Sequence, residues 1–330
     1  MSAALASAVG LVADRLLGEP PAAVHPVAAF GRMMVRLETA LWRDSRSAGA
    51  VYTAAGAGLG VVAGAALDRA VPTTALGPGL PATAVATWLV VAGRALGDEA
   101  RAIGARLAAD DLDGARQRLP ALVGRDPDSL DAKGVARAVV ESVAENTVDA
   151  VVAPACWAAA AGAAGAGFYR AVNTLDAMVG HHNARYEHFG WASARLDDSA
   201  NWIPARLAGG LVAAVRPRRA REVLGAVGHP PAHPSPNAGV VEAAFAAALG
   251  LRLGGDTVYA GRVDPRPAFG AGRPPEPADI DAAVRLSRDV TLALAALLAA
   301  PSALVALRRS AVRRSAVRRS DLRRLAGGAG

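Results

Sequence analysis

Four uncharged, mostly apolar stretches constrain what this chain can fold into more than any other feature. They are residues 47–67, 70–93, 150–169 and 290–307, which are 21, 24, 20 and 18 residues long. A helix needs roughly 17–25 apolar residues to cross the hydrocarbon core of a bilayer. The first and last stretches therefore predict membrane helices. Prolines in the second place the start of a crossing helix near Pro81, and the weakly hydrophobic third stretch, which contains Pro154, stays open.

The apolar content comes from small and aliphatic residues. Hydrophobic residues make up 52% of the chain and aromatic residues only 4%, with a mean hydropathy of +0.25. Small residues are typical of contacts between membrane helices, and alternating strand patterns are absent. We therefore expect an all-α, multi-pass membrane protein with a helical cytoplasmic portion between apolar segments. Residues 1–307 are predicted to form one membrane-embedded domain that includes a mostly soluble helical insertion at 98–149.

The positive net charge of +7 comes from the C-terminal tail. Residues 308–324 hold eight arginines and one aspartate, and the rest of the chain holds 28 basic and 28 acidic residues. This excludes a broad nucleic-acid-binding surface and favours contact with an anionic lipid bilayer. The positive-inside rule places the low-complexity tail, 308–330, in the cytoplasm. Arginines between 170 and 221 argue against export of that segment, so the number of crossings stays open.

Acidic side chains recur at helical spacing just before the third stretch. Glu141, Glu145 and Asp149 fall at i, i+4 and i+8 of a helix expected at 131–149, which places them on one side. Like charges at this spacing repel unless a cation or basic group lies between them. A solvated acidic face is the plain alternative. Asn146 lies beside these acids, and the helix leads directly into an apolar stretch, so we favour a ligand or Mg²⁺ role.

Two further clusters follow. Asn173 and Asp176 lie three residues apart, and Asp197 and Asp198 are followed by Asn201. Each cluster alone is weak evidence, because Asn and Asp also cap helices and form turns. Three clusters within 61 residues together predict a polar site that binds a charged ligand. By contrast, the glycine-rich segment 56–60 lies in an apolar stretch and predicts helix packing, not a dinucleotide loop.

Several sequence blocks occur in the order of a known family. They are DRLLGEP with HPV (14–27), GRD (124–126), RAVVESVAENTVD (137–149), FYRAVNTLDAMVG (168–180), FGWASARLDDSANWIPARL (189–207), SPNAG (235–239) and ALGLRLGG (248–255). On these blocks the chain resembles adenosylcobinamide-phosphate synthase, the CobD/CbiB family of cobalamin biosynthesis. The blocks cover about a third of the chain. Departures such as Ala150 in place of the usual glycine, and Arg170 in place of the usual lysine, put only local geometry in doubt.

The resemblance implies an integral membrane enzyme that uses ATP and Mg²⁺. It would join (R)-1-amino-2-propanol, or its O-phosphate, to the corrinoid adenosylcobyric acid as an amide. We assign catalytic metal or base roles to Glu141, Glu145 and Asp149, and further metal or amine contacts to Asp176, Asp197 and Asp198. Binding of substrate or phosphate is assigned to Arg125, Asn146, Arg170, Asn173, Asn201 and Arg206. The expected partners are these substrates, the lipid bilayer of the cell membrane and other enzymes of the pathway, with no nucleic acid.

Two other functions stay open. A membrane transferase that uses a Mg²⁺-diphosphate substrate would also place Asn/Asp clusters beside apolar helices, with two clusters facing one cavity. A non-catalytic membrane sensor or scaffold could keep the fold, but it would be expected to lose the acids, and this chain has kept them.

Overall fold

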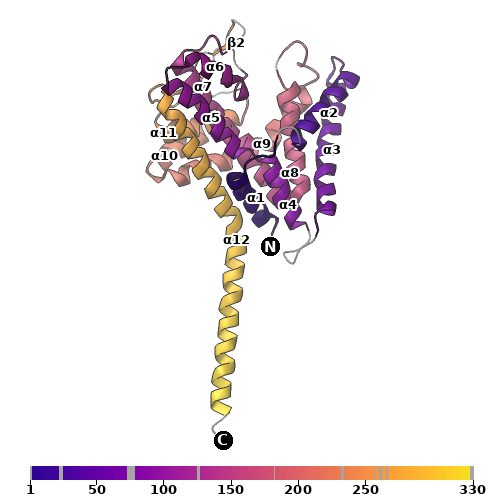
Figure 1. The fold of residues 1–330 in the computed structure, drawn as a ribbon, viewed down its shortest axis with the longest axis vertical. Coiled ribbons are helices and arrows are strands. Elements are labelled where there is room, and N and C mark those ends of the chain that lie inside the picture. The colour runs from indigo at the N-terminus through magenta and orange to yellow at the C-terminus, as the bar shows by residue number, and fades with distance from the viewer. Residues whose placement is uncertain are drawn as a thin grey trace.

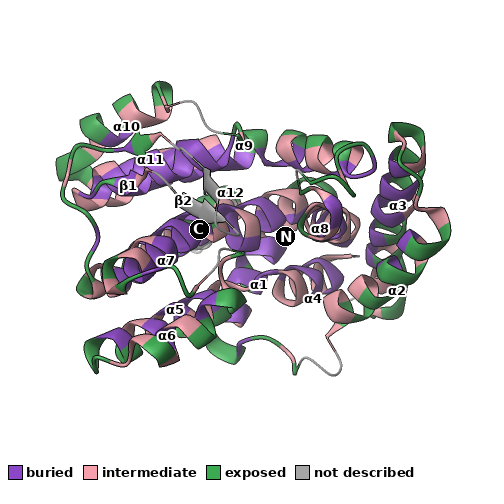
Figure 2. Ribbon diagram, turned by 90° about the horizontal axis from the view of Figure 1, so that it is seen from above, coloured by how far each residue is buried: buried purple, intermediate pink, exposed green. Residues whose placement is uncertain are grey.

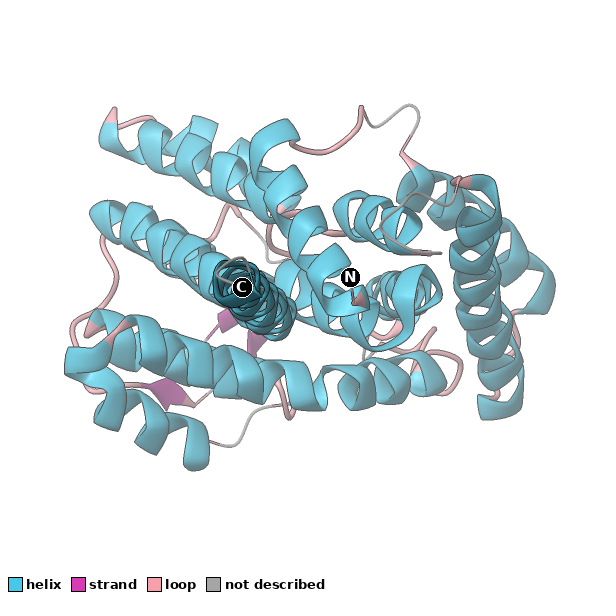
Figure 3. Ribbon diagram, turned by 90° about the horizontal axis from the view of Figure 1, so that it is seen from below, coloured by secondary structure: helices cyan, strands magenta, loops and turns pink. Residues whose placement is uncertain are grey.

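The computed structural model describes residues 2–21, 25–72, 79–124, 127–181, 183–231, 234–255, 257–259, 262–264 and 267–327. It is almost entirely helical (Figures 1 and 3), which confirms the predicted all-α class. The helices are α1 (Ala3–Leu17), α2 (Pro26–Leu41), α3 (Arg46–Ala70), α4 (Leu80–Val90), α5 (Gly93–Ala108), α6 (Leu112–Arg118), α7 (Ala132–Thr147), the π-helix η3 (Val148–Val152), α8 (Ala153–Val179), α9 (Trp191–Val215), α10 (Ala220–Gly228), α11 (Ala238–Leu249) and α12 (Pro277–Gly327), with short 3-10 turns η2 (Leu119–Ala121) and η4 (Pro217–Arg219).

Four very short strands form two antiparallel pairs. Strand β1 (Leu253–Gly254) pairs with β4 (Ala268–Phe269), and β2 (Thr257–Tyr259) pairs with β3 (Arg262–Asp264). They lie in the connection between α11 and α12. The sheet content is therefore a local feature of one connection and not a layer of the fold.

Three segments of the described chain are long and apolar enough to cross a membrane: Arg46–Ala70, Leu80–Ala108 and Ala132–Val179. They contain the predicted stretches 47–67, 81–93 and 150–169. The second segment begins one residue before Pro81, as predicted, and has a non-helical step at Val91 and Ala92 between α4 and α5. The third stretch, left open by the sequence, thus belongs to a helical segment of spanning length, which has a non-helical kink at Ala161 and Gly162.

The last predicted membrane stretch, 290–307, lies in α12. Figure 1 shows α12 as one long helix that leaves the helical body and ends near the C-terminus. The side chains from residue 305 onward lie outside the described part of the chain. The crossing at 290–307 therefore stays a prediction.

Helices α3 and α8 approach closely through glycines. A Cβ atom on Gly60 would lie 2.3 Å from the carbonyl oxygen of Gly167, and one on Gly64 would lie 2.1 Å from that of Ala163. Only hydrogen fits at these positions, as in packed membrane helices. The predicted packing role of segment 56–60 is confirmed. The outer face of α3 exposes Val51 and Val62, which suits contact with lipid.

The helix predicted at 131–149 does not end at Asp149. It changes at Thr147 into the π-helix η3 and then continues as α8. Pro154 has no N–H to donate to the carbonyl of Ala150, four residues earlier. That carbonyl instead accepts the N–H of Ala92 at 3.0 Å. Because Pro154 cannot bond the carbonyl of Ala150, this carbonyl of the π-helix is available to the backbone at the break between α4 and α5.

Burial is greatest along α7, η3 and the inner faces of α8 and α11 (Figure 2). Helices α5 and α7 pack against α12, while α3 and α4 pack against α8. Helix α9 contacts α8, α11 and α12 and so joins these two groups. This arrangement brings the end of α7 close to the beginning of α9, where the polar clusters lie.

Candidate functional site

Five carboxylates from four helical segments line one cavity of about 190 Å³. Helix α7 contributes one of them, η3 one, α8 one and α9 two. Backbone and side-chain groups of the segment before α11 close its other side. The acidic side chains are Glu145, Asp149, Asp176, Asp197 and Asp198, and the polar residues that line the cavity with them are Asn201, Ser235 and Asn237.

Local structure explains how these acids reach the cavity. The π-helix places Asp149 on the same wall as Glu145, and π-turns are frequent at functional sites. Gly180, at the end of α8, leaves room for the carboxylate of Asp176: a Cβ there would lie 1.9 Å from its Oδ1. The block NTLDAMVG thus pairs an acid with the glycine that accommodates it.

A chain of hydrogen bonds holds Asp197 in place. Asn201 donates to its Oδ2 at 2.9 Å, and Asn173 donates to its Oδ1 at 3.4 Å. Tyr169 in turn donates its hydroxyl to Oδ1 of Asn201 at 2.8 Å. On the other side, Arg170 donates to Oδ1 of Asn173 at 3.1 Å. Because both oxygens of Asp197 accept hydrogen bonds, its carboxylate has a fixed orientation at the cavity wall.

Burial makes the negative charges in this cavity costly. The pKa of Asp197 rises from 3.8 to about 6, chiefly because burial removes water, while the hydrogen bonds from Asn201 and Asn173 oppose the rise. Burial also raises the pKa of Asp198, against the hydrogen bond from Ser235. A bound cation would relieve this cost, because an opposite charge favours the ionised carboxylates.

The cavity also contains residues to which the sequence analysis gave no role. Ser235 donates to Oδ1 of Asp198 at 3.3 Å, and Asn237 donates to the backbone carbonyl of Asp198 at 2.8 Å. Both belong to the block SPNAG. The block was therefore visible in the sequence, but no local feature of the sequence indicated that it would lie against α9.

Other predicted site residues lie away from the cavity. Glu141 is buried and accepts the N–H of Gly254 at 2.7 Å, while Arg137 donates to the carbonyl of the same glycine at 2.9 Å. Together they fasten strand β1 to α7. Asn146 donates back to the carbonyl of Ser142, one turn earlier on its own helix.

The predicted arginines occupy three different situations. Arg170 lines a separate apolar cavity and donates to the carbonyl of Val90 as well as to Asn173. Arg206 stacks over Trp202, with 4.2 Å from its guanidinium carbon to the ring centroid, and donates to Asn237 at 3.3 Å. It therefore reaches a cavity residue without lining the cavity. Arg125 lies outside the described residues.

The donors in the cavity are all oxygens, which suits a hard cation such as Mg²⁺. Among the described residues, no group of three or more His, Cys, Asp or Glu side chains is arranged as a metal site by itself. The residues thus do not fit a closed protein cage. They do fit an ion held by one or two carboxylates, with substrate phosphates and water completing its shell.

A more open hollow adjoins the acidic cavity and shares Asp198 with it. Its other lining residues are Arg195, Ser199, Trp202 and Pro236. The Trp202 side chain is 53% exposed and Ile203 next to it is 68% exposed. The acidic cavity therefore opens beside a basic and aromatic surface on α9.

Comparison with known proteins gives the chain its relatives. The sequence profile of the CobD/Cbib protein family matches residues 7–287. The cobalamin biosynthesis protein CobD of Mycobacterium tuberculosis is 46% identical over 297 residues, which cover 88% of this chain and 92% of that protein. That of Rhodobacter capsulatus is 43% identical over 296 residues, 87% of this chain and 93% of the relative.

A cobalamin biosynthesis protein CobD from Geobacter metallireducens is 42% identical over 272 residues, 78% of this chain and 83% of that protein. No solved structure shows a significant match. The family resemblance carried by the sequence blocks is confirmed. This chain belongs to the CobD/CbiB protein family.

Proposed function

We propose that this protein acts in cobalamin biosynthesis as an amide-forming synthase of the membrane. It would join (R)-1-amino-2-propanol, or its O-phosphate, to adenosylcobyric acid and give adenosylcobinamide or its phosphate. Family membership supports the pathway. The observation that carries the site is the convergence of five carboxylates on one cavity. A cavity with this charge suits a cationic amine and a divalent cation better than a free anion.

The reaction needs an activated acid and a deprotonated amine. A carboxylate is a poor acyl donor, so ATP would supply the activation, with the γ-phosphoryl group passing to the corrinoid carboxylate and ADP leaving. The amine nitrogen then attacks the carbonyl carbon, phosphate leaves, and the ammonium proton passes to a base. A carboxylate with a pKa near 6, such as Asp197, could take that proton at neutral pH.

The residues that line the cavity would have different roles: some would bind the cation or the amine, and others would orient a neighbouring side chain. One or two of the carboxylates of Glu145, Asp149 and Asp176 would hold Mg²⁺, which when bound would neutralise phosphate charge. Asp198 lines both the acidic cavity and the open hollow, so it would meet the incoming amine. Asn201 keeps Asp197 oriented through its hydrogen bond.

The basic and aromatic surface next to the cavity would receive the large substrates. Arg195 lines the hollow, and Arg206 lies over Trp202 at its edge. Guanidinium groups bind phosphate and carboxylate oxygens in pairs, and an exposed indole gives a flat apolar surface. We assign the corrinoid carboxylate and the ATP phosphates to this surface. Arg125 keeps its proposed phosphate role from the sequence.

The site is proposed to face the cytoplasm, where ATP is available, in a multi-pass protein of the cell membrane. Three helices of spanning length support membrane residence. The orientation rests on the basic flanks and the arginine-rich tail. Other enzymes of the pathway are proposed as partners that supply or receive the corrinoid.

One observation favours the transferase alternative. Asp176 on α8 and the group Asp197, Asp198 and Asn201 on α9 face the same cavity, as two clusters of a Mg²⁺-diphosphate site would. Glu145 and Asp149 add a third acidic wall that such a site does not require. Transfer from an isoprenoid diphosphate, with diphosphate release, is the assay that would favour this alternative.

The deciding experiment combines metabolites and purified protein. Deleting the gene should cause adenosylcobyric acid to accumulate, while the purified protein in nanodiscs should convert it to the amide only with ATP, Mg²⁺ and the amine. Comparing free aminopropanol with its O-phosphate identifies the amine. Accumulation of cobinamide without adenosylcobyric acid, or product formation without ATP, would contradict the proposed reaction.

A further inference from the structure

Two acids at opposite ends of one long helical segment meet at the same cavity. Asp149 in the π-helix η3 and Asp176 near the end of α8 both line the acidic cavity of about 190 Å³. A straight helix rises ~1.5 Å per residue, so the stretch from 149 to 176 would measure roughly 40 Å along its axis. The chain between these two acids must therefore fold back on itself.

The backbone of α8 shows where the chain turns. Ala161 and Gly162 leave the helical region, with φ of 66° and ψ of −152° at Gly162. This combination is accessible almost only to glycine. A Cβ atom on Gly162 would also lie 3.3 Å from the hydroxyl oxygen of Thr83 on α4. The turn therefore depends on a glycine that has both an unusual conformation and a close neighbour.

Two contacts across the turn show that the parts before and after it lie side by side. The rings of Trp157 and Phe168 have centroids 4.9 Å apart, whereas a straight helix would separate these two residues by roughly 16 Å along its axis. A Cβ atom on Gly165 would overlap the carbonyl oxygen of Trp157. Residues 153–160 and 163–179 are therefore the two arms of a helical hairpin.

The hairpin packs among the helices expected in the membrane. Its first arm lies against α1, where Ser7 donates its hydroxyl to the carbonyl of Ala155 at 2.8 Å. Its second arm lies against α3 through the close contacts at Gly60 and Gly64. The turn lies beside Thr83, close to the start of α4. Because α3 and α4 belong to segments long enough to cross a membrane, the hairpin lies at the same depth as these helices.

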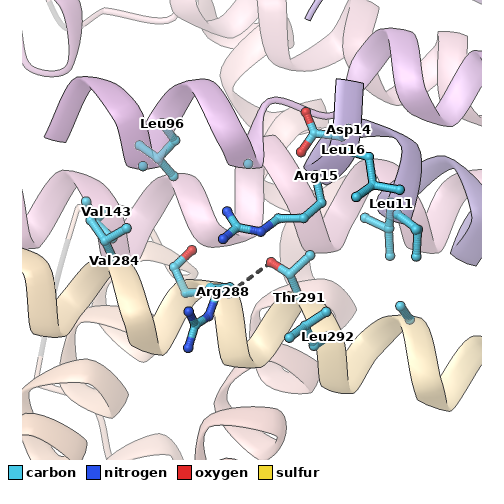
Figure 4. A pocket seen from close by; sticks show the side chains of 15 residues that line it. Leu11, Asp14, Arg15, Leu16, Leu96, Val143, Val284, Arg288, Thr291 and Leu292 are labelled. Carbon is cyan, nitrogen blue, oxygen red and sulfur yellow. Dashed lines mark hydrogen bonds between the residues drawn. The ribbon is translucent and has the colours of Figure 1, made fainter. Parts of the chain in front are cut away.

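The first arm begins close to charged groups of α1 and α12. A Cβ atom on Gly93 would lie 3.0 Å from the side chain of Val151 and 3.3 Å from Oδ2 of Asp14. Figure 4 shows Asp14 and Arg15 of α1 and Arg288 of α12 around an adjacent cavity with mainly apolar walls. The chain thus leaves a region of charged side chains at the start of the hairpin.

Basic segments precede and follow the hairpin. Residues 94–137 and 185–221 are both rich in arginine, and the uncharged stretch 150–169 lies between them. Basic connecting segments stay on the cytoplasmic side of a membrane. A single crossing at 150–169 would move one of these two segments to the other side, whereas a hairpin keeps both on the same side.

We infer that residues 150–179 form a membrane hairpin whose two ends lie on the same side of the bilayer, and that this fold-back brings Asp149 and Asp176 to one cavity. The stretch 150–169 is therefore not a single crossing. Gly162 is a positioning residue, because its conformation lets the second arm return beside the first. The inference does not depend on the proposed reaction, since the hairpin would be needed for any chemistry at these two acids.

The first test determines on which side each end of the hairpin lies. Cys156, the single cysteine, is replaced by Ala, and one exposed position at a time becomes cysteine: Ala121→Cys before the hairpin, Ala184→Cys after it, or Ala70→Cys at the far end of α3. A membrane-impermeant maleimide is added to right-side-out and to inverted vesicles. We expect positions 121 and 184 to react in the same vesicles and position 70 in the opposite ones, because α3 contacts α9 near its start. Reaction of 121 and 184 in opposite vesicles would overturn the hairpin.

The second test measures a distance and needs no vesicles. Spin labels are attached at Asn146→Cys and Ala177→Cys in the Cys156→Ala protein, and their separation is measured by pulsed electron paramagnetic resonance in nanodiscs. A straight helix would place the two backbones roughly 45 Å apart. The hairpin predicts less than half that distance. A separation near the straight-helix value would contradict the fold-back.

The role of the turn glycine is tested in the same labelled protein. Gly162→Ala should lengthen or broaden the distance between the two labels, because alanine disfavours this backbone conformation. Gly58→Ala is the matched control, since Gly58 is exposed on α3 and a Cβ there meets nothing within 4 Å. An unchanged distance in folded Gly162→Ala would show that Gly162 does not position the arms. If that variant fails to fold, the side and distance measurements on the other proteins still decide whether the hairpin exists.

Failure of the hairpin and failure of the proposed reaction are distinguishable. Asp149→Asn should lose turnover if the acid serves the reaction, but the distance between the labels should stay as in the protein with Asp149. A short distance in a protein without synthase activity would therefore support the hairpin and contradict only the reaction. A long distance in an active protein would do the reverse.

Discussion

Replacing Asp197 by Asn should make the protein more stable at neutral pH and less active. The Asp197 side chain is 9% exposed, and its folded-state pKa of about 6 lies roughly two units above 3.8. Each unit corresponds to ~1.4 kcal/mol, so ionising this group in the folded protein costs about 3 kcal/mol at pH 7.5. The uncharged variant avoids that cost.

Part of this gain is lost to hydrogen bonding. Asp197 accepts from both Asn201 and Asn173, whereas Asn has one acceptor oxygen. Losing one of these bonds costs about 1 kcal/mol. The net stabilisation of Asp197→Asn should therefore be about 1–2 kcal/mol at pH 7.5.

The pH dependence has a definite sign. Because the folded-state pKa is raised, the folded protein binds more protons than the unfolded chain between pH 4 and 6, and wild-type stability falls as pH rises through that window. The advantage of Asp197→Asn should therefore grow from pH 4 to pH 6 and then level off. Below pH 4 only the lost hydrogen bond remains, so the variant should be slightly less stable than wild type.

The single cysteine provides the assay. Cys156 is half-buried in α8, so a maleimide dye that fluoresces on reaction reports its exposure during unfolding. The dye reports unfolding at pH 7.5; at pH 4.5, where too little thiolate remains for a maleimide to react, unfolding in the same detergent is followed by tryptophan fluorescence. The matched control is Asp279→Asn: burial raises the pKa of Asp279, but hydrogen bonds from Arg273 and Glu276 lower it overall. That variant should be less stable at neutral pH, the opposite sign.

Two outcomes would refute the reasoning. If Asp197→Asn were less stable than wild type at pH 7.5, the hydrogen bonds and not burial would dominate this carboxylate. If its stability difference did not change with pH, Asp197 would titrate alike in the folded and unfolded states. Activity is measured on the same samples, and a fall of roughly 10²-fold is expected if Asp197 serves as base.

The remaining predictions concern the acids, the membrane and the tail. Glu145→Gln and Asp149→Asn should each lower turnover by roughly 10²-fold with folding retained, whereas the exposed control Glu222→Gln should not; wild-type turnover in both would show that the acids only hold helices together. The protein should stay in the membrane fraction after alkaline carbonate washing, and quantitative release would contradict the spanning helices. Deleting 308–330 should preserve turnover per folded molecule, and its loss in correctly inserted protein would place the tail in the site. Gly60→Val should lower thermal stability by separating α3 from α8, and an unchanged melting temperature would contradict their tight packing.

The membrane-length helices could be predicted from sequence because their signal is local. The uncharged stretch 47–67 predicted helix α3, and the proline at position 81 predicted the start of helix α4. The structure confirms both helices. The π-turn could not be foreseen. It depends on Ala92 arriving to satisfy the carbonyl of Ala150, a partner 58 residues away in sequence.

For the candidate site, the sequence indicated most of the acids that line the cavity but not how they are arranged. Glu141, Glu145 and Asp149 share a helical period, yet Glu141 turns to strand β1 and only the other two line the cavity. Helical period describes one helix and contains no information about which neighbour covers each side. Arg170 was assigned to substrate binding from the sequence. In the structure it donates to Asn173, which in turn donates to Asp197 on α9.

The sequence by itself determined the helical class, the membrane-length segments, the family and the three polar clusters. Only the tertiary structure decided that α7, α8 and α9 bring Glu145, Asp176 and Asp198 to one cavity, and that Asn237 closes it. The physical reason is one of range. Hydrophobic and helical periodicity act over a few turns, whereas the cavity depends on helix packing between residues far apart in the chain.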